Sequence, residues 1–197
     1  MVCGFALVSA AALGFKALQA EAAPSQLVLV VNTVEAGTSD AAKGDGVCAT
    51  DQGLCSLRAA IEESNATKGD TEVSIEVAPG VNGSILMTTS DSTWMTKDNP
   101  TGKDSGAYFH VTRTVSIDLD NRLGVKASSN GDAAAFWIEA PNTKLLRFSN
   151  IFPGETAIVF GPDADGSTLD GGQTIQTENW NTERLVWIRG GADNITV

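Results

Sequence analysis

Three aspartates in the second half of the chain have the spacing that most resembles a metal site. Asp163, Asp165 and Asp170 lie in the segment GPDADGSTLD, and Asp-x-Asp-Gly can begin a calcium-binding loop. The segment lacks the glutamate that normally ends such a loop, and Asp and Gly are also the residues of tight turns. A turn between strands is therefore the first interpretation and calcium binding is the alternative. The sequence points to no other cofactor.

A second kind of chemistry would need two carboxylates placed as acid and base for glycoside hydrolysis. Asp118 and Asp120 alternate with apolar residues, so both are expected on the solvent face of one strand. His110 lies between Phe109 and Val111 and is predicted to be a surface residue for the same reason. No catalytic constellation emerges from these residues.

Two long polar segments each contain a tryptophan. Residues 88–107 include Trp94, and residues 171–184 include Trp180. Long loops are often functional, and a tryptophan on one can stack on a sugar ring or anchor a protein partner. It can also fold back and cover its own loop. Trp94 and Trp180 are therefore candidate contacts to a carbohydrate or cell-surface partner.

The charge balance excludes two classes of partner. The chain has 13 Lys and Arg against 24 Asp and Glu, which gives a net charge of −11. An acidic surface repels phosphate backbones and anionic lipids. We therefore expect no nucleic-acid partner, and no membrane contact beyond the N-terminal segment.

The N-terminal residues have the pattern of an export signal. Residues 2–15 are apolar but too short to span a bilayer comfortably, and Ala20-Glu21-Ala22 is a small-x-small cleavage site. The pattern predicts a signal peptide over residues 1–22, with an uncleaved anchor as the alternative. An exported chain keeps two cysteines, Cys48 and Cys55, and an even pair in that setting predicts a disulfide.

A short helix is predicted directly after the second cysteine. Ser56 is a suitable N-cap, and the helical pattern runs to about Ser64. The face expected to be buried consists of Leu57, Ala60, Ile61 and Ser64. Arg58, Glu62 and Glu63 are expected to point outward.

The rest of the chain consists of short alternating apolar pairs separated by turns rich in Gly, Asn, Asp and Pro. The run Leu27 to Val31 predicts a first strand buried on both faces or nearly so. Phe160 follows Ile138 by 22 residues, and Ile188 follows Phe160 by 28. A period of twenty-odd residues favours a coil of stacked turns over the alternative, an antiparallel β-sandwich.

One stretch resembles a known family. VNTVEAGTSDAAKGDGVCATDQGLCSLRAAIEESNAT is similar, over about residues 28–67, to the module named for its Cys-Ser-Leu-Arg-Glu-Ala motif. The resemblance implies the N-terminal cap of a right-handed parallel β-helix, of the pectate-lyase-like shape found in secreted or surface bacterial proteins. Ala59 stands where the family has Glu, so half of the helix capping box is missing.

Together these patterns predict an all-β protein, a right-handed parallel β-helix with an N-terminal strand and helix as its cap. The expected divisions are a signal peptide at 1–22, a cap module at 23–70 and β-helix turns at 71–197, with further turns or a partner covering the open end. The expected function is a structural, adhesive or ligand-binding role at the cell surface or outside the cell. The alternative is a polysaccharide lyase or glycoside hydrolase, and a purely structural stalk is a third interpretation.

Overall fold

The computed structural model describes residues 24–35, 38–87, 107–127, 134–152, 156–171 and 184–197. In these residues twelve strands and one α-helix form an all-β arrangement, which confirms the predicted class. The predicted signal peptide and both candidate tryptophans, Trp94 and Trp180, lie outside the described residues. The described helix is too short and too polar to cross a membrane.

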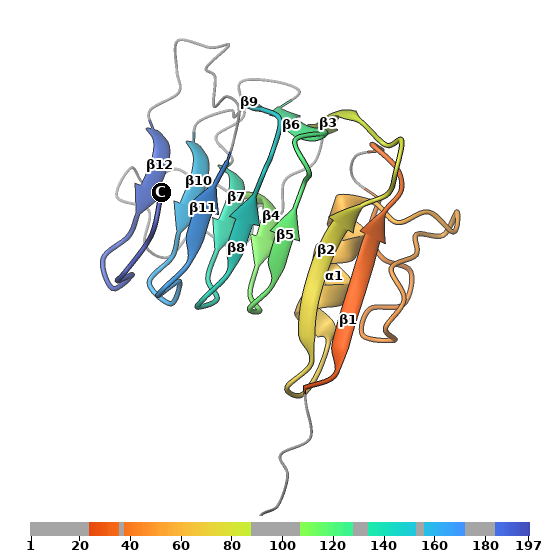
Figure 1. Cartoon of the computed structure of the whole chain (residues 1–197), viewed down its shortest axis with the longest axis horizontal. Helices are drawn as coiled ribbons and strands as arrows, with labels where there is room; N and C mark the ends of the chain where they lie inside the picture. Colours follow the sequence, from red (N-terminus) through yellow and green to blue (C-terminus); the bar gives the residue numbers. More distant parts are fainter. Residues whose placement is uncertain (1–23, 36–37, 88–106, 128–133, 153–155, 172–183) are drawn as a thin grey trace, which may run out of the picture.

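The strands form three sheets in which all pairs are parallel (Figure 1). The five-stranded sheet has the order β1 (Gln26–Val31), β2 (Glu72–Val77), β5 (Ser116–Asp118), β8 (Lys144–Leu146), β11 (Thr168–Asp170). The four-stranded sheet has the order β12 (Arg184–Ile188), β10 (Thr156–Phe160), β7 (Ala134–Ile138), β4 (Ala107–Val111). The three-stranded sheet has the order β3 (Gly83–Met87), β6 (Leu123–Ala127), β9 (Ile151–Phe152). From β2 to β11 the chain visits the five-, three- and four-stranded sheets in that order, repeatedly.

The register of the four-stranded sheet confirms the repeat seen in the sequence. Phe160 is paired with Ile138 on one side and with Ile188 on the other. Phe109 and Phe136 are partners in the same sheet, with ring centroids 5.0 Å apart. The buried members of these columns belong to the core, and each fully buried side chain contributes about 1.5–3 kcal/mol. Ile188, on the outer strand β12, is 47% exposed and lies outside that core.

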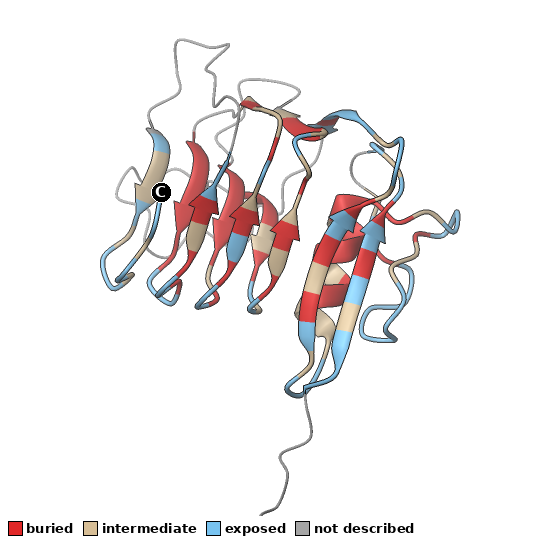
Figure 2. Ribbon diagram, viewed as in Figure 1, coloured by how far each residue is buried: buried red, intermediate tan, exposed pale blue. Residues whose placement is uncertain are grey.

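The first strand differs from its prediction. Leu29 and Val31 are buried, but Val28 and Val30 are 44% and 43% exposed (Figure 2). The strand is the outer member of its sheet, and α1 (Leu57–Ala66) packs against β1 and β2 on the core side, leaving the opposite face exposed. The continuous apolar run therefore does not correspond to burial on both faces.

The helix α1 also packs against β4, the last strand of the four-stranded sheet. The side-chain amide of Asn65 donates to the carbonyl oxygen of His110 at 2.8 Å and accepts from the N–H of Thr112 at 3.0 Å. A residue of a neighbouring parallel strand would make the same pair of contacts, one on each side of Val111. Asn65 thus satisfies part of the β4 edge that no other strand of the described ranges covers.

The junction between β2 and β5 combines a short strand ladder with hydrogen bonds from a side chain. The strands β2 and β5 are paired at two positions, Ser74 with Ser116 and Ile75 with Ile117. Beside this short ladder, the guanidinium of Arg113 donates at 2.6, 2.8 and 2.8 Å to three carbonyl oxygens, those of Thr67, Gly69 and Thr71. Charge-assisted bonds from one arginine therefore tie the end of α1 to the start of β5.

Candidate functional site

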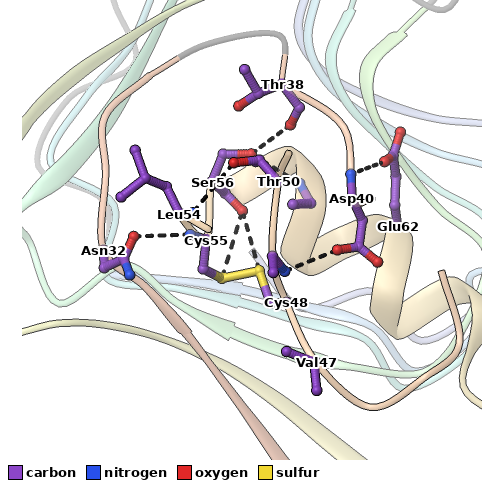
Figure 3. Close-up of a disulfide and its surroundings, with 12 residues drawn as sticks. Asn32, Thr38, Asp40, Val47, Cys48, Thr50, Leu54, Cys55, Ser56 and Glu62 are labelled. Carbon is purple, nitrogen blue, oxygen red and sulfur yellow. Dashed lines mark hydrogen bonds between the residues drawn. A yellow bond between two sulfur atoms is a disulfide. The ribbon is translucent and has the colours of Figure 1, made fainter. Parts of the chain in front are cut away.

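The two cysteines form the predicted disulfide, with an S–S distance of 1.98 Å (Figure 3). Ser56 is the N-cap of α1, because its Oγ accepts from the N–H of Ala59 at 3.0 Å and donates to the carbonyl oxygen of Thr38 at 2.7 Å. The disulfide and Ser56 therefore position α1 and the loop that precedes it. The helix ends at Ala66, two residues beyond the predicted end.

The prediction that Glu63 points outward is wrong. This side chain is fully buried, and its carboxylate accepts hydrogen bonds from the N–H groups of Gly44 and Gly46. The neighbouring Glu62 accepts from the N–H of Asp40 at 2.8 Å (Figure 3). Because both glutamates are committed to the loop backbone, they hold the 40–46 loop against α1.

A charged groove of about 290 Å³ lies where the outer face of the five-stranded sheet meets the corners that follow it. Its lining includes Glu76, Asp118, Asp120, Arg122 and Arg147. Arg147 donates to Asp118 from Nε at 2.9 Å and from Nη2 at 2.5 Å, and to Asp120 from Nη1 at 2.8 Å. Arg122 contacts Asp120 at 2.7 Å. Asp118 thus lies on the outer side of β5, as predicted. The prediction is wrong for Asp120, which lies in the turn after β5 with a φ of 51°, and both aspartates are paired.

The guanidinium of Arg122 also reaches back to the previous turn. It donates to the carbonyl oxygens of Val77 and Ala78, both at 2.8 Å. The groove therefore lies where β2 and β5 end, whereas the hydrogen bonds of Arg113 lie where these two strands begin.

Asp118 stays ionised in this arrangement. Partial burial favours the neutral acid, but the hydrogen bonds from Arg147, the N–H of Asp120 and the charge of Arg147 together keep the pKa of Asp118 below its ordinary value of 3.8. A carboxylate with a lowered pKa accepts hydrogen bonds and attracts cations, and it is a poor proton donor near neutral pH. The groove is suited to binding hydroxyl groups or charged groups, whereas protonating a leaving group would need another residue.

The three aspartates of the possible calcium loop lie around β11. Asp163 and Asp165 are exposed in the turn between β10 and β11, and Asp170 is the last residue of β11. Asp165 accepts from the N–H of Asp193 at 2.7 Å, so it stabilises the turn that follows β12. Within the described ranges, no group of three or more His, Cys, Asp or Glu residues is placed to hold a metal ion. This placement agrees with the turn interpretation, and calcium binding stays untested.

The prediction that His110 is a surface residue is wrong. Its side chain is 8% exposed, its Nε2 lies 2.7 Å from Oε2 of Glu139, and its ring centroid lies 5.1 Å from that of Trp137. The alternation of apolar residues assigned it correctly to the face opposite Phe109. That outer face is itself buried in part, since Trp137 is only 3% exposed there. Glu139 follows His110 by 29 residues, so sequence spacing alone gave no signal of the pair.

The two segments with candidate tryptophans join the same sheet. Residues 88–106 precede Ala107, the first residue of β4, and residues 172–183 precede Arg184, the first residue of β12. These are the two outer strands of the four-stranded sheet. The positions of Trp94 and Trp180 themselves are outside the described residues.

Comparison of this chain with protein-family models, with curated proteins and with solved structures finds no match.

Proposed function

We propose that this chain is part of an exported, right-handed parallel β-helix that binds a carbohydrate or another cell-surface partner, and that residues 23–70 close its N-terminal end. The repeated order in which the chain visits three parallel sheets supports a coil. Connections between parallel strands are almost always right-handed, which favours that hand. The disulfide supports folding in an oxidising compartment.

The entry of both tryptophan-containing segments into one sheet is the observation on which the binding role rests. The strands that they precede, β4 and β12, are three strand spacings apart, or roughly 14 Å. Both segments reach the sheet at the N-terminal ends of parallel strands, which lie along one edge. We therefore propose that one elongated ligand runs along this edge, and we assign Trp94 and Trp180 as its contacts.

A glycan array probed with the whole chain tests this role. We expect binding to a subset of glycans, with a loss of about two- to tenfold for Trp94→Ala and for Trp180→Ala, because stacking on an aromatic ring contributes about 0.5–1.5 kcal/mol. Lys68→Ala, on an exposed residue, is the matched control and keeps wild-type binding. Glycan binding that survives the loss of both tryptophans would contradict the assignment.

The charged groove supports an alternative role as a polysaccharide-active enzyme. Glu76 comes from one turn of the chain and Asp118 and Asp120 from the next, and they lie beside Arg122 and Arg147. An enzyme would release reducing ends or unsaturated sugars from an acidic polysaccharide, and Asp118→Asn would abolish the release. If purified protein neither cleaves polysaccharides nor binds glycans, the purely structural stalk is favoured.

A further inference from the structure

A second pocket lies between the cap helix and the four-stranded sheet. Its volume is about 290 Å³, and one face of α1 forms one wall with Arg58, Ile61, Glu62 and Asn65. These residues are spaced at helical intervals, so they lie on one side of the helix. The opposite wall comes from β4, and Lys43 of the cap loop completes the lining. The pocket therefore lies between the two parts of the fold that Asn65 joins.

The described lining of this pocket carries more positive than negative charge. The chain as a whole has a net charge of −11, yet two cations, Lys43 and Arg58, line this small cavity. Glu62 is the one acid among the described lining residues, and Lys43 lies 3.3 Å from it. Local cationic side chains in an acidic protein attract an anion that the rest of the surface repels.

The wall formed by β4 contributes an aromatic ring and a hydrogen-bond donor that carries no charge. The guanidinium of Arg58 lies 5.8 Å from the ring centroid of Phe109, which fixes the cation above an apolar floor. Burial raises the pKa of Tyr108, so its hydroxyl stays protonated at neutral pH and can donate a hydrogen bond. Glu139 orients the ring of His110 through the 2.7 Å contact with Nε2.

We propose that this pocket binds a small organic carboxylate whose body is a single ring. Arginine and lysine pair with carboxylate oxygens, and Tyr108 supplies a further donor. The apolar floor of Ile61 and Phe109 receives the ring, and the volume matches a molecule about the size of a monosaccharide. The proposal rests on described residues and does not invoke Trp94 or Trp180, so its test is separate from that of the proposed glycan-binding role.

The chain carries its own reporters for this site. His110 is the single histidine and Tyr108 the single tyrosine of the 197 residues, and both line the pocket. Ring resonances of these two residues in NMR spectra are therefore free of overlap with others of their kind. Titration of the whole chain with glucuronate, benzoate and glucose tests the proposal.

We expect glucuronate or benzoate to shift the His110 and Tyr108 ring signals saturably, and glucose, which lacks the carboxylate, to leave them in place. Arg58→Gln is expected to weaken binding by at least about tenfold. Lys43→Gln, at a side chain that is 50% exposed, is a second test variant in case Arg58→Gln misfolds, and it should also weaken binding. Lys144→Gln, outside the pocket, is the control and should leave binding unchanged. Failure of both anions, equal binding of glucose, or unchanged binding by folded Arg58→Gln and Lys43→Gln would overturn the proposal.

Discussion

The carboxylate of Glu63 accepts a hydrogen bond from the backbone N–H of Gly46 at 2.6 Å, across 17 residues of sequence. The same side chain binds the N–H of Gly44, and none of its surface is exposed. Both glycines have positive φ, +89° at Gly44 and +85° at Gly46, which lets the loop direct two N–H groups toward one carboxylate. A buried charge is tolerated here because two backbone donors satisfy it.

The substitution Glu63→Gln should lower the free energy of unfolding by about 2–3 kcal/mol. The amide keeps one acceptor oxygen but turns an NH₂ group toward the second backbone N–H, so two donors face each other. Urea denaturation followed by circular dichroism measures the change.

The matched control is Glu76→Gln, at an exposed glutamate of β2. A surface change of this kind is expected to stay within about 0.5 kcal/mol. Equal stabilities for the two variants would show that the Glu63 contacts contribute nothing beyond those of a surface acid.

Removal of the Asn65 amide should uncover the edge of β4. Asn65→Ala deletes two hydrogen bonds and leaves the carbonyl of His110 and the N–H of Thr112 without these partners, so we expect a loss of about 1–2 kcal/mol. Hydrogen exchange should accelerate at the amide of Thr112. Asn82→Ala, whose amide contacts only the nearby carbonyl of Gly80 at 3.2 Å, is expected to change neither quantity.

The disulfide should stabilise the cap to a moderate degree, because Cys48 and Cys55 are only seven residues apart. A loop of this length corresponds to about 2–3 kcal/mol of restricted unfolded-state entropy. Replacing both cysteines with serine should therefore lower the unfolding free energy by that amount. Adding reductant should destabilise the wild type in the same way and leave the double variant unchanged, and a double variant as stable as the wild type would contradict the estimate.

The helix cap, the disulfide and the strand repeat were predictable because each depends on residues close in sequence or on a regular spacing. Ser56 is recognisable as an N-cap from its position before a helical pattern. The Cys48–Cys55 pair follows from the even number of cysteines beyond the predicted signal peptide. The partners Ile138, Phe160 and Ile188 were visible as a repeat, since apolar residues recur at the paired positions of these parallel strands, although Ile188 is itself 47% exposed.

The polar contacts were not predictable because they join different turns. Glu63 was assigned outward on hydrophobicity alone, although its partners are glycine N–H groups in an earlier loop. His110 meets Glu139, and Asp118 meets Arg147, each 29 residues later. The spacing between paired residues is 22 from Ile138 to Phe160 and 28 from Phe160 to Ile188. Because this spacing varies, counting residues along the sequence does not show which residue of the next strand lies beside a given polar side chain.

The pairing of Asp118 with Arg147 should make the charged groove sensitive to acid. The pKa of Asp118 is lower in the folded protein than its ordinary value of 3.8, so its contribution to stability is complete above that value. That contribution is lost as the pH falls through the lowered pKa.

Arg147→Ala removes the hydrogen bonds and the positive charge that lower the pKa, and the titration of Asp118 should then move to higher pH. Carboxyl ¹³C chemical shifts recorded from pH 6 to pH 2 measure both midpoints, with Lys68→Ala as the charge-matched control. If Asp118 titrates at the same pH in the wild type and in Arg147→Ala, Arg147 does not set its ionisation, and the groove would hold a carboxylate free to accept a ligand proton.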